Sequence, residues 1–175
     1  DRVRGRLDVS EKLNMDITRR KTAELFSAAC ALPALFQPST LHLTETLQEY
    51  GRDLGHCFQL IDDLLDFTSH RAELGKPVMA DLREGRVTLP ILLLLPRLDM
   101  AQKERLQEVA ATGSFDAMPE AEVLEMVRTS GVLQEVRDRA AGFSESAARR
   151  AERFPPVPER DALLLATRLL LERKI

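Results

Sequence analysis

The sequence of 175 residues predicts an all-α fold, and three observations support this. Proline and glycine divide the chain into blocks, and apolar residues within the blocks recur at steps of three and four. No block shows the alternation that a half-buried strand requires. Since about 150 residues is a usual size for one domain, we expect a single domain with a sizeable core.

The first block predicts a helix over residues 10–35. Ser10 can cap its start, and Pro38 follows its end. A stripe of apolar residues at helical spacing supports the helix. The stripe consists of Leu13, Ile17, Leu25, Phe26 and Ala29.

A second helix is expected over residues 40–68. Within it Gly51 and Gly55 lie one turn apart, which lets a neighbouring helix approach closely, at a cost of roughly 1 kcal/mol per glycine relative to alanine. The residues expected to face inward are Leu43, Leu47, Leu54, Phe58, Ile61 and Leu65.

Beyond this helix the periodicity fails over residues 69–87, so we expect a long loop with room for one helical turn. Pro90 suits the first turn of a short, buried helix that ends at Leu95. Further helices are expected over residues 101–111, 120–130, 132–153 and 159–174.

Composition excludes several classes of protein. With 25 basic and 28 acidic residues the net charge is −3, which argues against a nucleic-acid binder. Cys30 and Cys57 lie in apolar helical segments and are expected to be reduced, as in a cytoplasmic protein. The longest apolar run, residues 89–95, is far short of the ~18 residues that a membrane span needs. The chain begins without Met, and we expect it to start partway through a longer protein.

The stretch over residues 55–66 carries three carboxylates inside an apolar helix. Asp62 and Asp66 lie one turn apart on one side, Asp63 is rotated by about 100° from Asp62, and Gln59 lies at the edge of the same face. Stacked carboxylates repel each other unless a cation neutralises them, and ligands that are all oxygen suit Mg²⁺. A solvated acidic face, or carboxylates paired with arginines, remains an open alternative.

Cationic residues occur at three places that could complete such a site. Lys21 and Thr22 lie within the first helix, Lys76 follows a glycine in the loop, and Arg86 follows another glycine. Each of these charges, taken singly, is typical of a surface. Taken with the aspartates they predict a diphosphate site, with Mg²⁺ on one side and ammonium and guanidinium groups on the other.

These motifs, in this order and spacing, resemble the C-terminal half of the trans-isoprenyl (polyprenyl) diphosphate synthases. They are Lys21-Thr22-Ala23, Phe58-Gln59-Leu60-Ile61-Asp62-Asp63-Leu64-Leu65-Asp66, Gly75-Lys76-Pro77, and Asp81-Leu82-Arg83-Glu84-Gly85-Arg86-Val87-Thr88-Leu89-Pro90. The ending over residues 158–163 is similar to the long-chain members that make quinone side chains. The resemblance implies the isoprenoid synthase fold, a helical bundle around a central cavity, and a homodimer.

The resemblance also implies an activity, which is the Mg²⁺-dependent joining of an allylic diphosphate to isopentenyl diphosphate with release of diphosphate. By this analogy the carboxylates hold Mg²⁺, the cations bind the allylic diphosphate, and two polar groups stabilise the developing allylic cation. The metal residues are Asp62, Asp63 and Asp66, the diphosphate residues are Lys21, Lys76 and Arg86, and the cation-stabilising groups are the Thr22 hydroxyl and the Gln59 carbonyl.

One feature limits what this chain is expected to do alone. The family's first aspartate-rich motif belongs upstream of these motifs, and nothing in residues 1–16 supplies it. We therefore expect the isolated chain to be inactive, and its product length is undetermined.

One alternative is a non-catalytic partner subunit of a heteromeric synthase, although the intact aspartates argue against it. A terpene cyclase would replace Asp62-Asp63-Leu64-Leu65-Asp66, and a di-iron protein would need Glu-x-x-His pairs that are absent.

Overall fold

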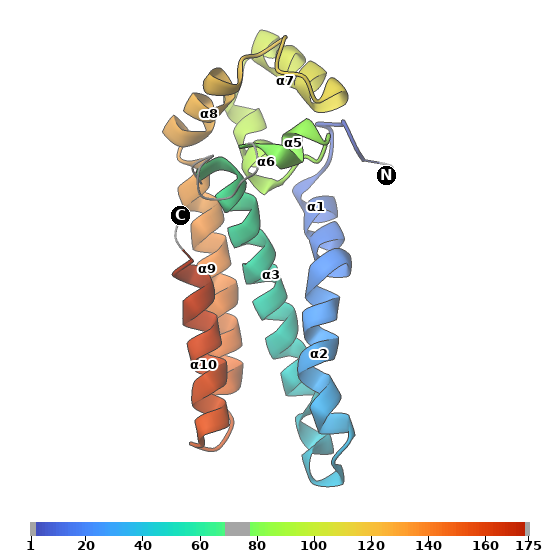
Figure 1. The fold of residues 1–175 in the computed structure, drawn as a ribbon, viewed down its shortest axis with the longest axis vertical. Coiled ribbons are helices and arrows are strands. Elements are labelled where there is room, and N and C mark those ends of the chain that lie inside the picture. Colours follow the sequence, from blue (N-terminus) through green and yellow to red (C-terminus); the bar gives the residue numbers. More distant parts are fainter. Residues whose placement is uncertain (1–2, 69–77, 174–175) are drawn as a thin grey trace. The chain divides into compact units, whose positions relative to one another are not determined.

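The computed structural model describes residues 3–68 and 78–173, and all regular elements within them are helical (Figure 1). Contacts divide the chain into two compact units. Unit 1 comprises Asp1–Asn14 and Asp62–Val136 with the terminal Ile175, and unit 2 comprises Met15–Ile61 and Arg137–Lys174. The division falls within the helices α1 (Glu11–Thr18), α3 (Thr44–Thr68) and α9 (Val132–Ala151).

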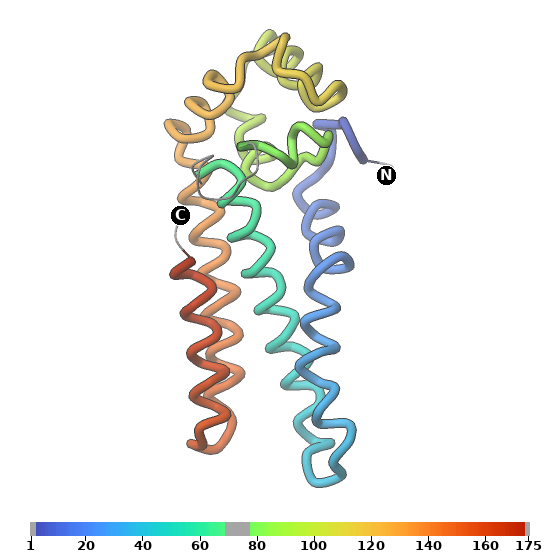
Figure 2. The backbone as a smooth tube through the Cα atoms, in the orientation of Figure 1, coloured from blue at the N-terminus to red at the C-terminus, as the bar shows by residue number. Residues whose placement is uncertain are grey.

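Unit 2 is built around a close contact between α3 and the helix before it. Besides its parts of α1, α3 and α9, the unit contains the π-helical segment η1 (Arg19–Ala23), α2 (Glu24–Leu35), the 3-10 helix η2 (Pro38–Leu43) and α10 (Pro158–Leu171). The backbones of α2 and α3 run side by side (Figure 2).

Two glycines of α3 make this contact possible. A Cβ atom on Gly51 would lie 2.5 Å from the carbonyl oxygen of Phe26, and one on Gly55 would lie 2.6 Å from the Cα atom of Ala23. Because both atoms belong to the backbone, no side-chain rotation could relieve the overlap. The close approach predicted from Gly51 and Gly55 is therefore confirmed.

On another side, α3 packs against α10, which lies beside α9 (Figure 1). The hydroxyl of Tyr50 donates a hydrogen bond of 2.8 Å to the carbonyl oxygen of Leu163, and burial raises the pKa of this tyrosine. Ser144 of α9 donates a bond of 2.9 Å to the carbonyl oxygen of Thr167 in α10. These bonds to main-chain oxygens satisfy buried hydroxyl groups that would otherwise destabilise the core.

Unit 1 surrounds a short helix that is buried on all sides. It contains α5 (Ala80–Arg83), α6 (Leu89–Leu94), η3 (Leu95–Arg97), α7 (Met100–Thr112) and α8 (Glu120–Thr129). Every residue of α6 is buried, as expected for this run. Pro90 lies in the first turn, where N–H groups have no partner within the helix, so its lack of an N–H costs no hydrogen bond. A capping box between Asp99 and Gln102 begins α7, and Gly113 ends it with a φ of 73°.

The observed helices agree with the predicted blocks except at two places. Residues 19–23 form a π-helical turn within the first predicted helix, and residues 38–43 form a 3-10 helix where the α-helix was expected to begin. Apolar spacing does not distinguish these helix types over a single turn. The helical turn expected in the loop is α5, while residues 69–77 lie outside the described part of the chain.

Part of the first apolar stripe is exposed rather than packed. Leu25 is 71% exposed, and further along α2 Leu32 and Leu35 are each 52% exposed, followed by Phe36 at 80%. We call these four residues the α2 face. Only Leu25 of these four belongs to the apolar stripe that the sequence predicts, and periodicity carries no information on what covers that side of the helix.

The glycine contact yields a prediction for stability. Gly55→Ala should lower the free energy of unfolding by roughly 1–3 kcal/mol, because the new methyl group meets the backbone of Ala23. Gly142→Ala in α9 is the matched control. No atom lies within 4 Å of a Cβ at that position, so the change should raise stability by about 0.5–1 kcal/mol. Urea unfolding measures both, and equal effects of the two substitutions would contradict the account.

Candidate active site

Lys21 and Thr22 lie in the π-helical segment η1, which distorts the helix at this point. Single π-helical turns are frequent at functional sites because the extra residue shifts the side chains of that turn. Lys21 is exposed, and it forms no ion pair with a carboxylate of residues 3–68 or 78–173. Its neighbours differ, since Arg19 pairs with Asp16 and Glu24. Lys21 is therefore available to an anion from outside the described chain.

The structure brings together two of the predicted site residues in unit 2. The hydroxyl of Thr22 donates a hydrogen bond of 2.8 Å to Oε1 of Gln59. Both side chains are partly buried, and the bond lies beside the contact between Gly55 and Ala23. The glycine contact thus holds a hydroxyl and an amide carbonyl, two groups that can stabilise positive charge, at a fixed separation.

The three carboxylates of the acidic run differ in their surroundings. Asp62 is exposed, Asp63 is 3% exposed, and Asp66 is partly buried. Asp66 accepts hydrogen bonds from two main-chain N–H groups, from Ala80 to Oδ1 at 2.9 Å and from Asp81 to Oδ2 at 3.1 Å. Asp62 is therefore the member of the run whose oxygens are most open to a ligand.

The pKa of Asp66 is raised from its ordinary value to about 6. Burial is the largest cause, and the nearby carboxylate of Asp81 acts in the same direction. The two main-chain N–H groups and the charge of Arg86 oppose the rise, because they stabilise the ionised carboxylate.

Arg86 already has partners within its own turn. Its Nε atom donates to Oδ1 of Asp81 at 2.8 Å, and a second guanidinium nitrogen donates to Glu84. Arg86 is thus surrounded by two carboxylates, and their negative charges offset the attraction of its guanidinium for a diphosphate. Its predicted role in diphosphate binding stays a prediction, and so does that of Lys76, which lies outside the described residues.

Sequence reasoning did not find the links from Asp66 to α5 and from Asp81 to Arg86. Asp81 and Arg86 are five positions apart, a spacing that pairs no side chains on a regular helix. Gly85, with a φ of 70°, makes the turn that brings them together, and the only signal in the sequence was that glycine.

The donor set of the acidic run fits Mg²⁺, which prefers carboxylate oxygens. Within the described ranges, no three His, Cys, Asp or Glu side chains gather closely enough to enclose a metal ion. Mg²⁺ usually binds through one or two carboxylates while water and phosphate oxygens complete its shell. The exposed Asp62 is suited to such an open site.

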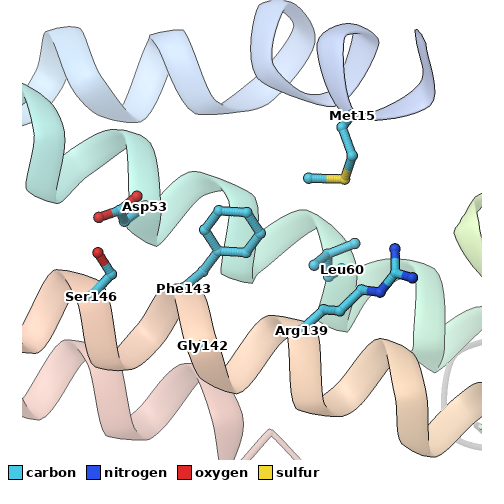
Figure 3. Close-up of a pocket in the computed structure, with 7 residues that line it drawn as sticks. All are labelled: Met15, Asp53, Leu60, Arg139, Gly142, Phe143 and Ser146. Atoms are coloured by element: carbon cyan, nitrogen blue, oxygen red, sulfur yellow. The ribbon is translucent and has the colours of Figure 1, made fainter. Parts of the chain in front are cut away.

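Unit 2 also contains a cavity of about 460 Å³ along one side of α3. Met15 of α1 and Leu60 of α3 line it with the ring of Phe143 from α9 (Figure 3). Asp53, at one end of the lining, pairs with Arg150 at 2.8 Å. The cavity wall is therefore largely apolar, and its acidic group is already neutralised.

His56 stacks on Phe143, with 4.8 Å between the ring centroids. The side chain is buried, and its Nδ1 atom has no hydrogen-bond partner among the described residues. Burial lowers the pKa of His56 from its ordinary value, the charges of Arg19 and Arg52 add to the effect, and Asp53 and Glu24 oppose it. His56 is thus a core residue whose buried surroundings disfavour its charged form.

The described structure thus combines an all-helical fold with an acidic run on α3 and a Lys-Thr pair on the π-helical segment η1. A family model described as polyprenyl synthetase matches residues 2–127, which lie in both units. The chain belongs to the polyprenyl synthetase family.

Individual relatives agree with this assignment. Octaprenyl diphosphate synthase of Escherichia coli is 34% identical over 166 residues, which are 95% of this chain and 51% of the relative. The short chain isoprenyl diphosphate synthase of Methanothermobacter thermautotrophicus is 34% identical over 169 residues, 97% of this chain and 51% of the relative. The chain spans about half the length of the curated relatives it matches, which agrees with the expected C-terminal half.

Solved structures share the fold. A polyprenyl synthase from Caulobacter crescentus, complexed with calcium and isoprenyl diphosphate, superposes with a TM-score of 0.90 and is 31% identical, with 99% of this chain and 53% of that chain covered. The isoprenoid synthase fold predicted from the sequence is thereby confirmed. Among the described residues, no helix combines the length and the apolar character that crossing a membrane requires.

The environment of His56 predicts a pH dependence of stability. Its pKa in the folded protein is below the ordinary 6.5, so the unfolded chain binds more protons as the pH falls through that value. Lowering the pH from 7.5 to 5.5 should therefore destabilise wild-type protein relative to His56→Leu, whereas the raised pKa of Asp66 acts in the opposite direction on both proteins alike. Urea unfolding at the two pH values measures this, with the exposed His42→Gln as control. An equal change in wild type and His56→Leu would show that His56 is not the cause.

Proposed function

We infer that the chain is part of a prenyltransferase that joins an allylic diphosphate to isopentenyl diphosphate and releases diphosphate. The observation that carries this proposal is the exposed Asp62 at the start of an acidic run on α3, in a chain of the polyprenyl synthetase family. The Caulobacter crescentus relative, which binds calcium and isoprenyl diphosphate, supports both a divalent cation and a prenyl diphosphate as ligands.

The acidic run is the proposed holder of Mg²⁺, with Asp62 as a direct ligand and Asp63 and Asp66 acting partly through water. When bound, the metal neutralises the leaving diphosphate, which lowers the cost of breaking the C–O bond. Lys21 and Lys76 are the proposed ammonium groups for the same diphosphate, and Arg86 is the proposed guanidinium group. Since ammonium donors are mobile point charges, they can follow the phosphate oxygens as charge develops.

Thr22 and Gln59 are the proposed stabilisers of the allylic cation. The Thr22 hydroxyl donates to Oε1 of Gln59, and this bond fixes the direction of the carbonyl dipole before reaction. A dipole that is already oriented stabilises a cation without the cost of reorganisation. Apolar walls around such a cation would keep water from capturing it.

The complete activity requires more than this chain. The chain covers 51% of the E. coli octaprenyl synthase and has one acidic run where the chemistry uses two carboxylate clusters. We expect the isolated chain to be inactive and the activity to belong to the complete synthase. Octaprenyl, nonaprenyl and solanesyl synthases among the relatives support a long-chain product.

The α2 face supports assembly as a homodimer. Its leucines are exposed on one side of one helix, and an exposed apolar patch of this kind is typical of a protein–protein contact. A two-fold dimer would place this face against its own copy.

Asp62→Ala in the complete synthase should lower Mg²⁺-dependent turnover by at least about 100-fold, because the diphosphate loses its metal ligand. A prenyl-transfer assay with labelled isopentenyl diphosphate measures it. Glu125→Ala, an exposed carboxylate on α8, serves as the control and should retain activity. Near-normal turnover in the Asp62 variant would overturn the metal assignment, and an inactive wild-type synthase would favour the non-catalytic subunit instead.

The double substitution Leu32→Glu and Leu35→Glu should convert a dimer into a 19.7 kDa monomer. It places two carboxylates on the α2 face, and burying charged groups in a dimer contact is unfavourable. Leu169→Glu is the matched control, since Leu169 is 54% exposed and lies on α10. Sedimentation equilibrium gives the mass. A wild-type chain that sediments as a monomer, or a double variant that stays dimeric, would exclude this interface.

A further inference from the structure

Asp66 holds the start of α5 through three consecutive main-chain groups. Its carboxylate accepts the N–H groups of Ala80 and Asp81, and its own carbonyl oxygen accepts the N–H of Met79 at 2.9 Å. One residue of α3 thus satisfies three donors at the beginning of α5. Hydrogen bonds from main-chain N–H to an ionised carboxylate are stronger than those to a neutral acceptor.

The segment that Asp66 holds needs external support. α5 has only four residues, too few for a helix to be stable by itself. Met79, immediately before it, adopts a left-handed conformation with a φ of 56°, which is unfavourable for a residue with a side chain, and this side chain is fully buried. The bonds to Asp66 and the burial of Met79 together offset this strain.

The contacts continue from α5 to Arg86. The carboxylate of Asp81 accepts from the Nε atom of Arg86 at 2.8 Å, and the main-chain N–H of Arg86 donates to the carbonyl oxygen of Asp81 at the same distance. Because Asp66 fixes the backbone of Asp81, it also fixes the residue that orients the guanidinium. Asp66, Asp81 and Arg86 form an unbroken series of hydrogen bonds within unit 1.

Asp62 does not take part in this series. It lies one turn before Asp66 on the same helix, yet it is exposed, and no hydrogen bond joins it to any described residue of α5. The two carboxylates that the sequence presents as equivalent therefore have different surroundings.

We propose that Asp66 is a positioning residue, which seats α5 and through Asp81 orients the guanidinium of Arg86, while Asp62 is left to bind the metal. The division of roles deepens the proposed function, since Arg86 matters to catalysis only if the diphosphate site exists. The hydrogen-bonded series itself can be tested without substrate, metal or turnover, so the two proposals can fail separately.

The test compares Asp66→Ala with Asp62→Ala in the 175-residue chain, and records the Arg86 Nε–H signal by ¹H–¹⁵N NMR. An Arg86→Lys variant assigns that signal. Asp66→Ala should speed hydrogen exchange of the Arg86 Nε–H and of the Ala80 and Asp81 amides by roughly tenfold, the equivalent of one lost charge-assisted bond. Asp62→Ala should leave all three unchanged.

Two further variants keep the outcome decisive. Asp66→Asn retains one acceptor oxygen, so it should give an intermediate increase in exchange even if Asp66→Ala fails to fold. Asp81→Ala, which removes the acceptor, should free the Arg86 Nε–H while the Ala80 amide stays protected, because Asp81 lies after Ala80 in the series. Unchanged Arg86 exchange in folded Asp66 variants, or equal changes in Asp62→Ala, would overturn the proposal.

Discussion

The contact of two α3 glycines with the backbone of the preceding helix is the constraint on which the Lys-Thr segment depends. Gly51 and Gly55 have no room for a Cβ, so α3 lies as close to η1 and α2 as main-chain atoms allow. This spacing places the Thr22 hydroxyl on the Gln59 carbonyl. A larger distance between the helices would break the hydrogen bond between the partly buried Thr22 hydroxyl and the Gln59 amide, and would cost the free energy of that bond.

The acidic run shows how one short motif can serve two purposes. Asp62 faces solvent at one turn of α3, and Asp66, one turn later, accepts the main-chain donors that begin α5. The helix sets the spacing of the carboxylates. The main-chain N–H groups that follow Met79 then determine that Asp66, and not Asp62, accepts hydrogen bonds from α5. The exposed carboxylate of the proposed metal site and the carboxylate that fixes the start of α5 are thus residues of the same type.

The sequence predicts the helices and the glycine contact well, because both depend on local spacing, and it brings Thr22 and Gln59 into one expected site, where the structure joins them by a hydrogen bond. It does not predict the partners of Asp66 or of Arg86, since both pairings depend on a left-handed Met79 and a glycine turn at Gly85. It also places Leu25 in an apolar stripe without revealing that this side chain is exposed. Periodicity identifies a face, whereas its burial depends on what packs against it.

The central claim is that this half of the family's fold carries a Mg²⁺-dependent diphosphate site on α3. Calorimetric titration of the chain with inorganic diphosphate, once with Mg²⁺ and once with a chelator, tests it most directly. The account predicts saturable binding of one diphosphate per chain with Mg²⁺ present and none with the chelator. Binding of equal strength in both solutions, or no binding in either, would contradict it.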